Sequence, residues 1–176
     1  VASIVAFTGV FAAFLLEKGW AAAPVIALTL FIGAFVGFLQ GYAVHEFKIA
    51  PFLITLAGQF LMRGMCAVVS TISIPITNDF FKSAALAKIS WVTASGSRPK
   101  LYYYVFFAIA IVIIAWYILR FTRFGRAVYA VGSNEQSAQY MGLNVKGVKV
   151  GVYAINGFCS ALGGILFSFY TLAGYS

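Results

Sequence analysis

Charged residues are scarce in this chain of 176 residues. Asp, Glu, Lys and Arg together make up 9% of it, and only four of these residues are acidic, whereas a soluble domain carries roughly a quarter charged residues. Hydrophobic residues make up 62%. A chain of this composition cannot hide its apolar surface from water, so we expect lipid to be its solvent for most of its length.

Histidine and cysteine are also scarce, which excludes several kinds of site. His45 is the only histidine, which argues against a histidine-based metal cluster. Cys66 and Cys159 each stand alone within an apolar run, and we interpret them as packing residues rather than as a disulfide or a metal pair. No G-x-x-x-x-G-K-[ST] phosphate-binding loop and no Ser/His/Asp constellation is present, so the sequence favours neither a nucleotide site nor an intramembrane enzyme.

Basic residues outnumber acidic ones, and the formal net charge is +8. In a soluble protein this excess would suggest a nucleic-acid partner. Here the basic residues lie at the ends of apolar runs, which is typical of cytoplasmic loops and lipid headgroup contacts and points to no nucleic acid. The first residue is Val1, and the apolar pattern begins there without a basic n-region, so we expect an internal part of a longer membrane protein rather than a signal peptide.

Five apolar runs are predicted to cross the membrane as helices, because a span in lipid must satisfy its own backbone hydrogen bonds. About 20 residues suffice to cross a hydrocarbon core of about 30 Å. The predicted fold is therefore an all-α, polytopic membrane protein, a bundle of helices forming one transmembrane domain over residues 1–176. The predicted spans are residues 1–16, 21–44, 52–74, 101–119 and 148–173.

Two long loops separate these spans. Arg120, Arg123 and Arg126 cluster at the end of the fourth predicted span, which places the loop at residues 120–147 on the cytoplasmic side. By alternation the connector near His45 also lies inside, and the polar loop at residues 76–100 lies outside. Within that outer loop, "TNDFFKSAALAKISW" is compatible with a short surface helix.

The second span carries Gly33, Gly37 and Gly41 one turn apart on one face. Glycines at this spacing let another backbone approach, so we expect this face to pack against a neighbouring helix.

Several spans also contain polar side chains, among them Thr29, Gln40 and Thr55. Gln59 and Arg63 lie four residues apart, hence on one face of the third span. An arginine within a span costs at least about 2.5 kcal/mol, so Arg63 should face protein or a watery cavity. Gln59, Arg63 and Asn156 are therefore our candidates for a substrate path. The alternative is that each polar group bonds a neighbouring helix.

The cytoplasmic loop predicts one short helix of its own. Ser133 is a good N-cap and Gln136 follows three residues later, which together form a capping box. Gly142 can take the left-handed conformation that ends a helix. The predicted helix covers about residues 134–141 and would be marginal alone in water. Lipid headgroups or another protein could hold it, or it is an ordinary surface helix that ties two spans together.

The stretch "TRFGRAVYAVGSNEQSAQYMGLNVKGVKVGVYAINGFCSALGGILF" resembles the cytoplasmic loop and following helix of the permease subunits of bacterial ABC sugar importers of the ribose type. In that family T-R-x-G-R leads into a G-x-N-E-x-A-A-x-x-x-G-like segment. "APFLITLAGQFLMRG" resembles another segment of the same family, so the likeness covers nearly the whole chain. Among the members it looks most like a galactofuranose importer permease. Relative to E-A-A-x-x-x-G, Gln136 and Ser137 replace the alanines and the glycine comes one residue later.

The resemblance implies that the short helix is a coupling helix, which sits in a cleft of a separate ATP-binding subunit. This chain would do no covalent chemistry and bind no cofactor, with ATP and magnesium held by that partner. Other implied partners are a second permease subunit, the same chain or a relative, and a periplasmic sugar-binding protein at the outer loop. The implied location is the bacterial inner membrane. The coupling residues implied by position are Arg123, Gly125, Arg126, Glu135, Ala138, Tyr140, Met141 and Gly142.

An ion-coupled secondary transporter of a small solute is the alternative. That class usually carries a titratable acid within its spans to exchange a proton or sodium. The four acids of this chain, Glu17, Glu46, Asp79 and Glu135, fall in predicted loops or at span ends, which counts against this alternative.

Overall fold

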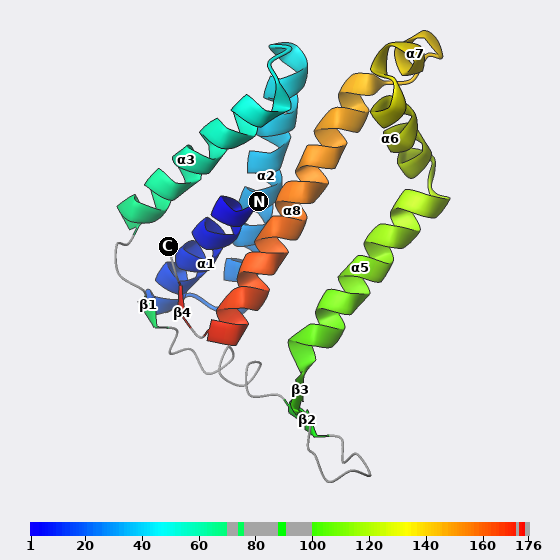
Figure 1. Cartoon of the computed structure of the whole chain (residues 1–176). Coiled ribbons are helices and arrows are strands. Elements are labelled where there is room, and N and C mark those ends of the chain that lie inside the picture. Colours follow the sequence, from blue (N-terminus) through cyan, green and yellow to red (C-terminus); the bar gives the residue numbers. More distant parts are fainter. Residues whose placement is uncertain (70–73, 76–87, 91–99, 172, 175–176) are drawn as a thin grey trace.

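The structure is a computed structural model and describes residues 1–69, 74–75, 88–90, 100–171 and 173–174 (Figure 1). This part is almost entirely helical, which confirms the predicted all-α membrane fold. The helices are α1 Ala2–Glu17, α2 Ala22–Glu46, α3 Pro51–Val69, α5 Tyr103–Phe121, α6 Arg123–Ser133, α7 Glu135–Tyr140 and α8 Val145–Thr171. Two short antiparallel pairings join β1 Ile74–Pro75 to β4 Ala173–Gly174 and β2 Lys88–Ser90 to β3 Lys100–Tyr102. The surface helix expected within residues 77–91 lies outside the described residues, except for Lys88–Ser90, which form a strand.

A helix covers most of each of the five predicted spans, although Ile74, Leu101, Tyr102 and Ala173 at the predicted span ends lie in short strands. The helices also differ in their ability to cross a membrane. By length and composition, α2, α3 and α8 qualify alone. The residues Val105–Phe121 of α5 qualify together with α6 as a pair bent by 74° at a short break. α1 is a shorter apolar helix of 16 residues. The described residues therefore offer three or four candidate spans.

Four helices form a bundle and one stands apart. α1 packs against α2, α3 and α8, and α8 packs along α2. Figure 1 shows α5 to one side of this bundle, joined to it through α6 and α7. Two clusters of buried side chains fill the space around α1: Ala12, Ala13, Leu16 and Val25 towards α2, and Ile4, Phe7, Met62 and Cys66 towards α3.

The most extensive helix contact joins α2 to α8, and Gly33, Gly37 and Gly41 of α2, all buried, lie in it. A Cβ atom on Gly33 would lie 2.8 Å from the carbonyl oxygen of Gly157, and one on Gly41 would lie 2.8 Å from Cβ of Tyr153. A Cβ atom on Gly37 would collide with the carbonyl group of Tyr153. Since real Cβ atoms do not approach other atoms so closely, only glycine lets these two backbones meet.

The helix ends lie at two levels. The α2–α3 connector lies at the same end as α7 and the start of α8, while the α1–α2 connector lies at the other end (Figure 1). At the end that holds the α2–α3 connector, an ion pair of 3.1 Å joins Glu46 of α2 to Lys146 of α8. The loop at residues 120–147 and the connector near His45 therefore share one side, as alternation predicted.

Candidate functional site: a braced surface helix and a polar cavity

α6 is a helix where the sequence predicted only loop. Its N-cap is Thr122, whose Oγ1 accepts a hydrogen bond from the Gly125 N–H at 3.1 Å. Its apolar side faces α8, where Phe124 lies against Gly151. The missed signal is a threonine N-cap followed by apolar residues at helical spacing, Phe124, Ala127, Val128 and Val131.

Gly125 lies inside the bend between α5 and α6. It is buried, and a Cβ there would run into the backbone of Leu119. Arg123 and Arg126 are exposed on α6. Of these three residues expected on the approach to the coupling helix, the structure thus places two arginines at the surface and the glycine where it permits the sharp turn.

The N-cap of α7 lies one residue later than predicted, and the predicted capping box is wrong. Asn134 is the N-cap, with an extended backbone and an Oδ1 that accepts a hydrogen bond from the Ser137 N–H at 3.0 Å. Ser133 instead ends α6 and donates its hydroxyl to the carbonyl of Ala130 at 2.9 Å. Because α6 continues through Ser133, only Asn134 is free to take the extended backbone that an N-cap requires.

The end of α7 follows the prediction. Gly142 has φ +79°, the left-handed conformation, which confirms its role as the stop of this helix. The Gly142 N–H donates to the Gln139 carbonyl at 3.0 Å, and the Leu143 N–H donates to the Ala138 carbonyl at 3.1 Å. These two backbone hydrogen bonds close the C-terminal turn of α7, although the helix has only six residues.

The side chains of α7 and its C-cap divide into an anchor and an exposed pair. Ala138 is fully buried, whereas Tyr140 is 90% exposed and Met141 is 68% exposed. The carboxylate of Glu135 bonds Nζ of Lys149 on α8, 2.7 Å from each oxygen. A short helix that is bound to the rest of the chain and exposes a tyrosine and a methionine to solvent is suited to insertion into a groove of another protein.

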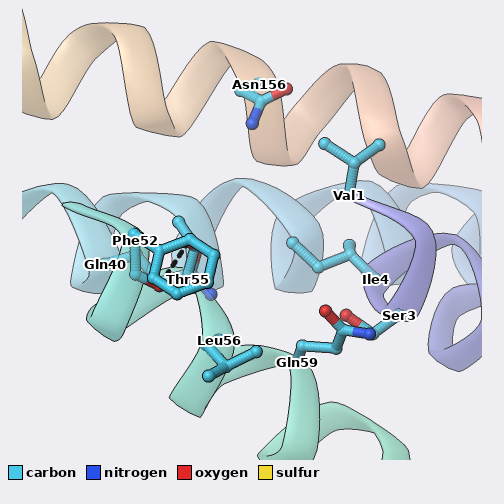
Figure 2. Close-up of a pocket in the computed structure, with 9 residues that line it drawn as sticks. All are labelled: Val1, Ser3, Ile4, Gln40, Phe52, Thr55, Leu56, Gln59 and Asn156. Atoms are coloured by element: carbon cyan, nitrogen blue, oxygen red, sulfur yellow. Dashed lines mark hydrogen bonds between the residues drawn. The ribbon is translucent and has the colours of Figure 1, made fainter.

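A second feature is a cavity of about 300 Å³ between α1, α2, α3 and α8 (Figure 2). This volume is at the lower end of the range for small-molecule sites, roughly 300–1,000 Å³. Figure 2 shows Asn156 on α8 across the cavity from the α3 side chains. The polar lining residues are Ser3, Gln40, Thr55, Gln59 and Asn156, and the apolar ones are Val1, Ile4, Phe52 and Leu56.

A neighbouring cavity of about 280 Å³ shares two residues with the first, Ser3 and Gln59, and is also lined by Arg63. The structure thus places Gln59 and Arg63 of α3 and Asn156 of α8, the three candidates for a substrate path, in the walls of two adjoining cavities. It adds Ser3, which the sequence analysis missed because one hydroxyl in an apolar run carries no signal by itself.

The two threonines among the in-span polar groups bond their own helix. The Thr29 hydroxyl donates to the Val25 carbonyl at 2.9 Å, and the Thr55 hydroxyl donates to the Pro51 carbonyl at 3.0 Å. The partner is therefore the preceding turn of the same helix, not a neighbouring helix as the alternative had it.

No acidic side chain lines either cavity. Within the described part of the chain, no group of three or more His, Cys, Asp or Glu residues is placed to hold a metal ion. The arrangement can offer amide and hydroxyl hydrogen bonds to a small ligand, and it offers no acidic group to pair with a cation.

Comparison with known families matches residues 1–176 to the family described as "Branched-chain amino acid transport system / permease component". Among the curated relatives, the inner membrane ABC transporter permease protein YjfF of Escherichia coli K12 is 36% identical over 178 residues, which cover 100% of this chain and 52% of the relative. The ribose import permease protein RbsC of Haemophilus influenzae is 37% identical over 168 residues, 94% of this chain and 50% of the relative. The fructose import permease protein FruG of Bifidobacterium longum is 34% identical over 170 residues, 96% and 50% respectively.

The chain spans about half the length of these relatives. No solved structure matches it significantly.

Proposed function

This chain belongs to the family of transport-system permease components, and from that premise we propose that it forms part of the permease subunit of an ATP-binding-cassette importer. The proposed cargo is a monosaccharide, carried across the bacterial inner membrane. ATP hydrolysis takes place in a separate subunit that binds ATP and magnesium, and α7 docks on that subunit. A second permease subunit and a periplasmic sugar-binding protein complete the complex.

The cavity in Figure 2 is the observation that carries the cargo class. The amides of Gln40, Gln59 and Asn156 both donate and accept hydrogen bonds, which suits the hydroxyl groups of a sugar. An amino acid, the cargo in the family description, carries an ammonium group whose burial without a carboxylate partner is costly. The lining has no acidic side chain, and two of the relatives are named for ribose and fructose, so the support is for a neutral sugar.

Within the sugars, we propose a galactofuranose-like or ribose-like monosaccharide. The support is the resemblance of the stretch from Thr122 to Phe167 to importers of that branch. The similarity to a ribose import permease adds to it.

The placement of the acids favours ATP-driven transport over ion-coupled transport. In the described residues Glu17 ends α1, Glu46 ends α2 and Glu135 begins α7. An ion-coupled carrier usually needs such a group inside a span, and there is none in the described part of the candidate spans α2, α3, α5 and α8 apart from the terminal Glu46.

The test is reconstitution of the full-length permease with its ATP-binding and sugar-binding subunits in liposomes. We expect the ATP-binding subunit to copurify with the permease and uptake to require ATP. A panel of pentoses, hexoses in both ring forms and branched-chain amino acids reports the cargo. Uptake driven by a proton or sodium gradient without the ATP-binding subunit would establish the alternative instead, and uptake of amino acids alone would overturn the sugar assignment.

The cavity residues give a sharper prediction. Gln59→Leu and Asn156→Leu each keep a similar side-chain volume but remove the hydrogen-bonding amide. Each lost hydrogen bond to a bound sugar costs about 1–1.5 kcal/mol, so uptake at low sugar concentration is expected to fall about tenfold. Ser168→Ala is the matched control, because this buried hydroxyl of α8 bonds its own helix at Gly164 and lines neither cavity. Wild-type uptake by both leucine variants would remove the cavity from the path.

A further inference from the structure

Two lysines stand in the first turns of α8, where the helix dipole disfavours positive charge. Each is matched by an acid from another helix. Nζ of Lys149 lies 2.7 Å from both carboxylate oxygens of Glu135 on α7, and Nζ of Lys146 lies 3.1 Å from Glu46 at the end of α2. Of the three acids in the described residues, two are used in these pairs. The start of α8 is therefore held from two sides.

Both pairs lie at the surface. The side chains of Lys149 and Glu135 are 25% and 49% exposed, and those of Lys146 and Glu46 are both 48% exposed. Pairs exposed to this degree add little to the stability of a fold. Their effect is on orientation: α7 has six residues and one buried side chain, Ala138, so a bond from its first residue to α8 helps to fix the direction in which it points.

α8 connects this end to the cavity. Lys149 and Asn156 are seven residues apart, about two turns, so they lie on one face of α8 about 10 Å apart along its axis. The close contact with the glycines of α2 begins at Val150 and Tyr153 of α8. Because α8 is one continuous helix from Val145 to Thr171, a displacement of its first turn is carried to Asn156 in the cavity wall.

We propose that Glu135 and Lys149 are positioning residues that join α7 to α8, so that both move as one body when the ATP-binding subunit moves α7. Lys146 and Glu46 join the same turn of α8 to α2. This inference rests on the proposed function. It gives Glu135 a different role from the one that the family resemblance implied, because its carboxylate faces α8 and orients the helix whose exposed Tyr140 and Met141 make the contact.

Charge reversal separates the two roles of Glu135. Glu135→Lys and Lys149→Glu each place like charges together, and each is expected to lower the sugar transported per ATP hydrolysed by about tenfold or more, while the ATP-binding subunit still copurifies. The double variant restores a pair of opposite sign and is expected to recover at least half of the wild-type ratio. Lys48→Glu is the control, because Lys48 belongs to the connector between α2 and α3, which lies at the same end as α7 (Figure 1), and it makes no ion pair with the described residues.

A double variant as poor as Glu135→Lys alone would overturn the proposal, as would full coupling in both single variants. Loss of copurification in Glu135→Lys but not in Lys149→Glu would do so too, since it would place Glu135 in the contact with the partner. Wild-type protein is assayed first: without ATP-dependent uptake in wild type the proposed function fails, and this result is separate from any effect of the variants.

A covalent link tests the motion itself, even if charge reversal disturbs folding. Cys66 and Cys159 are free cysteines, so each is first replaced by serine. Glu135→Cys and Lys149→Cys are then introduced together into this background. A short bifunctional thiol reagent then joins α7 to α8. The unlinked cysteine variant lacks the ion pair, so we expect it to transport less sugar per ATP hydrolysed than wild type. If the two helices move as one body, the link restores this ratio to that of wild type. A link that blocks transport would show that α7 moves relative to α8 and would sink the proposal.

Discussion

Gly37→Leu in α2 is expected to abolish the folded protein, and Gly157→Leu in α8 is expected to have the same effect. A Cβ on Gly37 has no room beside the Tyr153 carbonyl, and one on Gly157 has none beside the Gly33 carbonyl. The neighbouring atoms are backbone, so no side chain can turn aside. Overpacking costs about 1–3 kcal/mol even where side chains can adjust, and here α2 and α8 would have to separate along their whole contact.

The measurement is the yield of monodisperse protein in size-exclusion chromatography of detergent extracts, with the variants fused to a fluorescent reporter. Gly64→Leu in α3 is the matched control, because a Cβ at that position would meet no described atom beyond the neighbouring residues and backbone of its own helix within 4 Å, and its yield should equal that of wild type. Gly37→Ala is expected to fall between the two. A Gly37→Leu variant with the elution profile and thermal stability of wild type would show that α2 and α8 do not meet as described.

The apolar helices and the close packing of this glycine face could be predicted because their physical cause is local. Apolar runs of about 20 residues have one stable form in lipid, and Gly33, Gly37 and Gly41 fall on one face wherever that helix lies. The partner of that face could not be predicted. Nothing in the sequence near Gly37 indicates Tyr153 or Gly157, more than a hundred residues later.

The cytoplasmic loop shows where local signals compete. Ser133 and Asn134 are adjacent, and both are good N-caps, so the choice between them depends on where the preceding helix ends. That end is set by α6, which packs Phe124 against Gly151 of α8, a contact that the sequence of the loop does not reveal. Gly142 could be predicted because the left-handed stop is a property of the residue itself.

The cavity and the ion pairs depend on tertiary contacts in the same way. Glu46 and Lys146 are 100 residues apart, and Ser3, Gln40 and Asn156 come from three helices. Single polar residues in apolar runs mark candidates, as Gln59 and Arg63 did, because their cost in lipid calls for a reason. Which of them share a cavity is decided by how the helices pack.

Gly142→Pro is expected to uncouple transport while leaving the spans folded. The φ of +79° at Gly142 is closed to proline, whose ring fixes φ near −65° and removes the N–H that bonds Gln139. The Leu143 bond to Ala138 depends on the same turn. A cost of about 3 kcal/mol or more would lower the population of correctly formed α7 by roughly 100-fold, and Tyr140 and Met141 would lose the position from which we propose that they contact the ATP-binding subunit.

The measurement is ATP-dependent uptake together with copurification of the ATP-binding subunit, and both are expected to fall by at least tenfold in Gly142→Pro. Gly142→Asn is the control: asparagine keeps the N–H and tolerates the left-handed region, so it should retain uptake within about threefold. Comparison of the two variants separates the effect of backbone conformation from the loss of glycine, and neither variant replaces Glu135, Lys149 or a residue of the cavity. Wild-type uptake and a stable complex in Gly142→Pro would show that α7 is not the docking element, because no helix can end at residue 142 in this way with proline there.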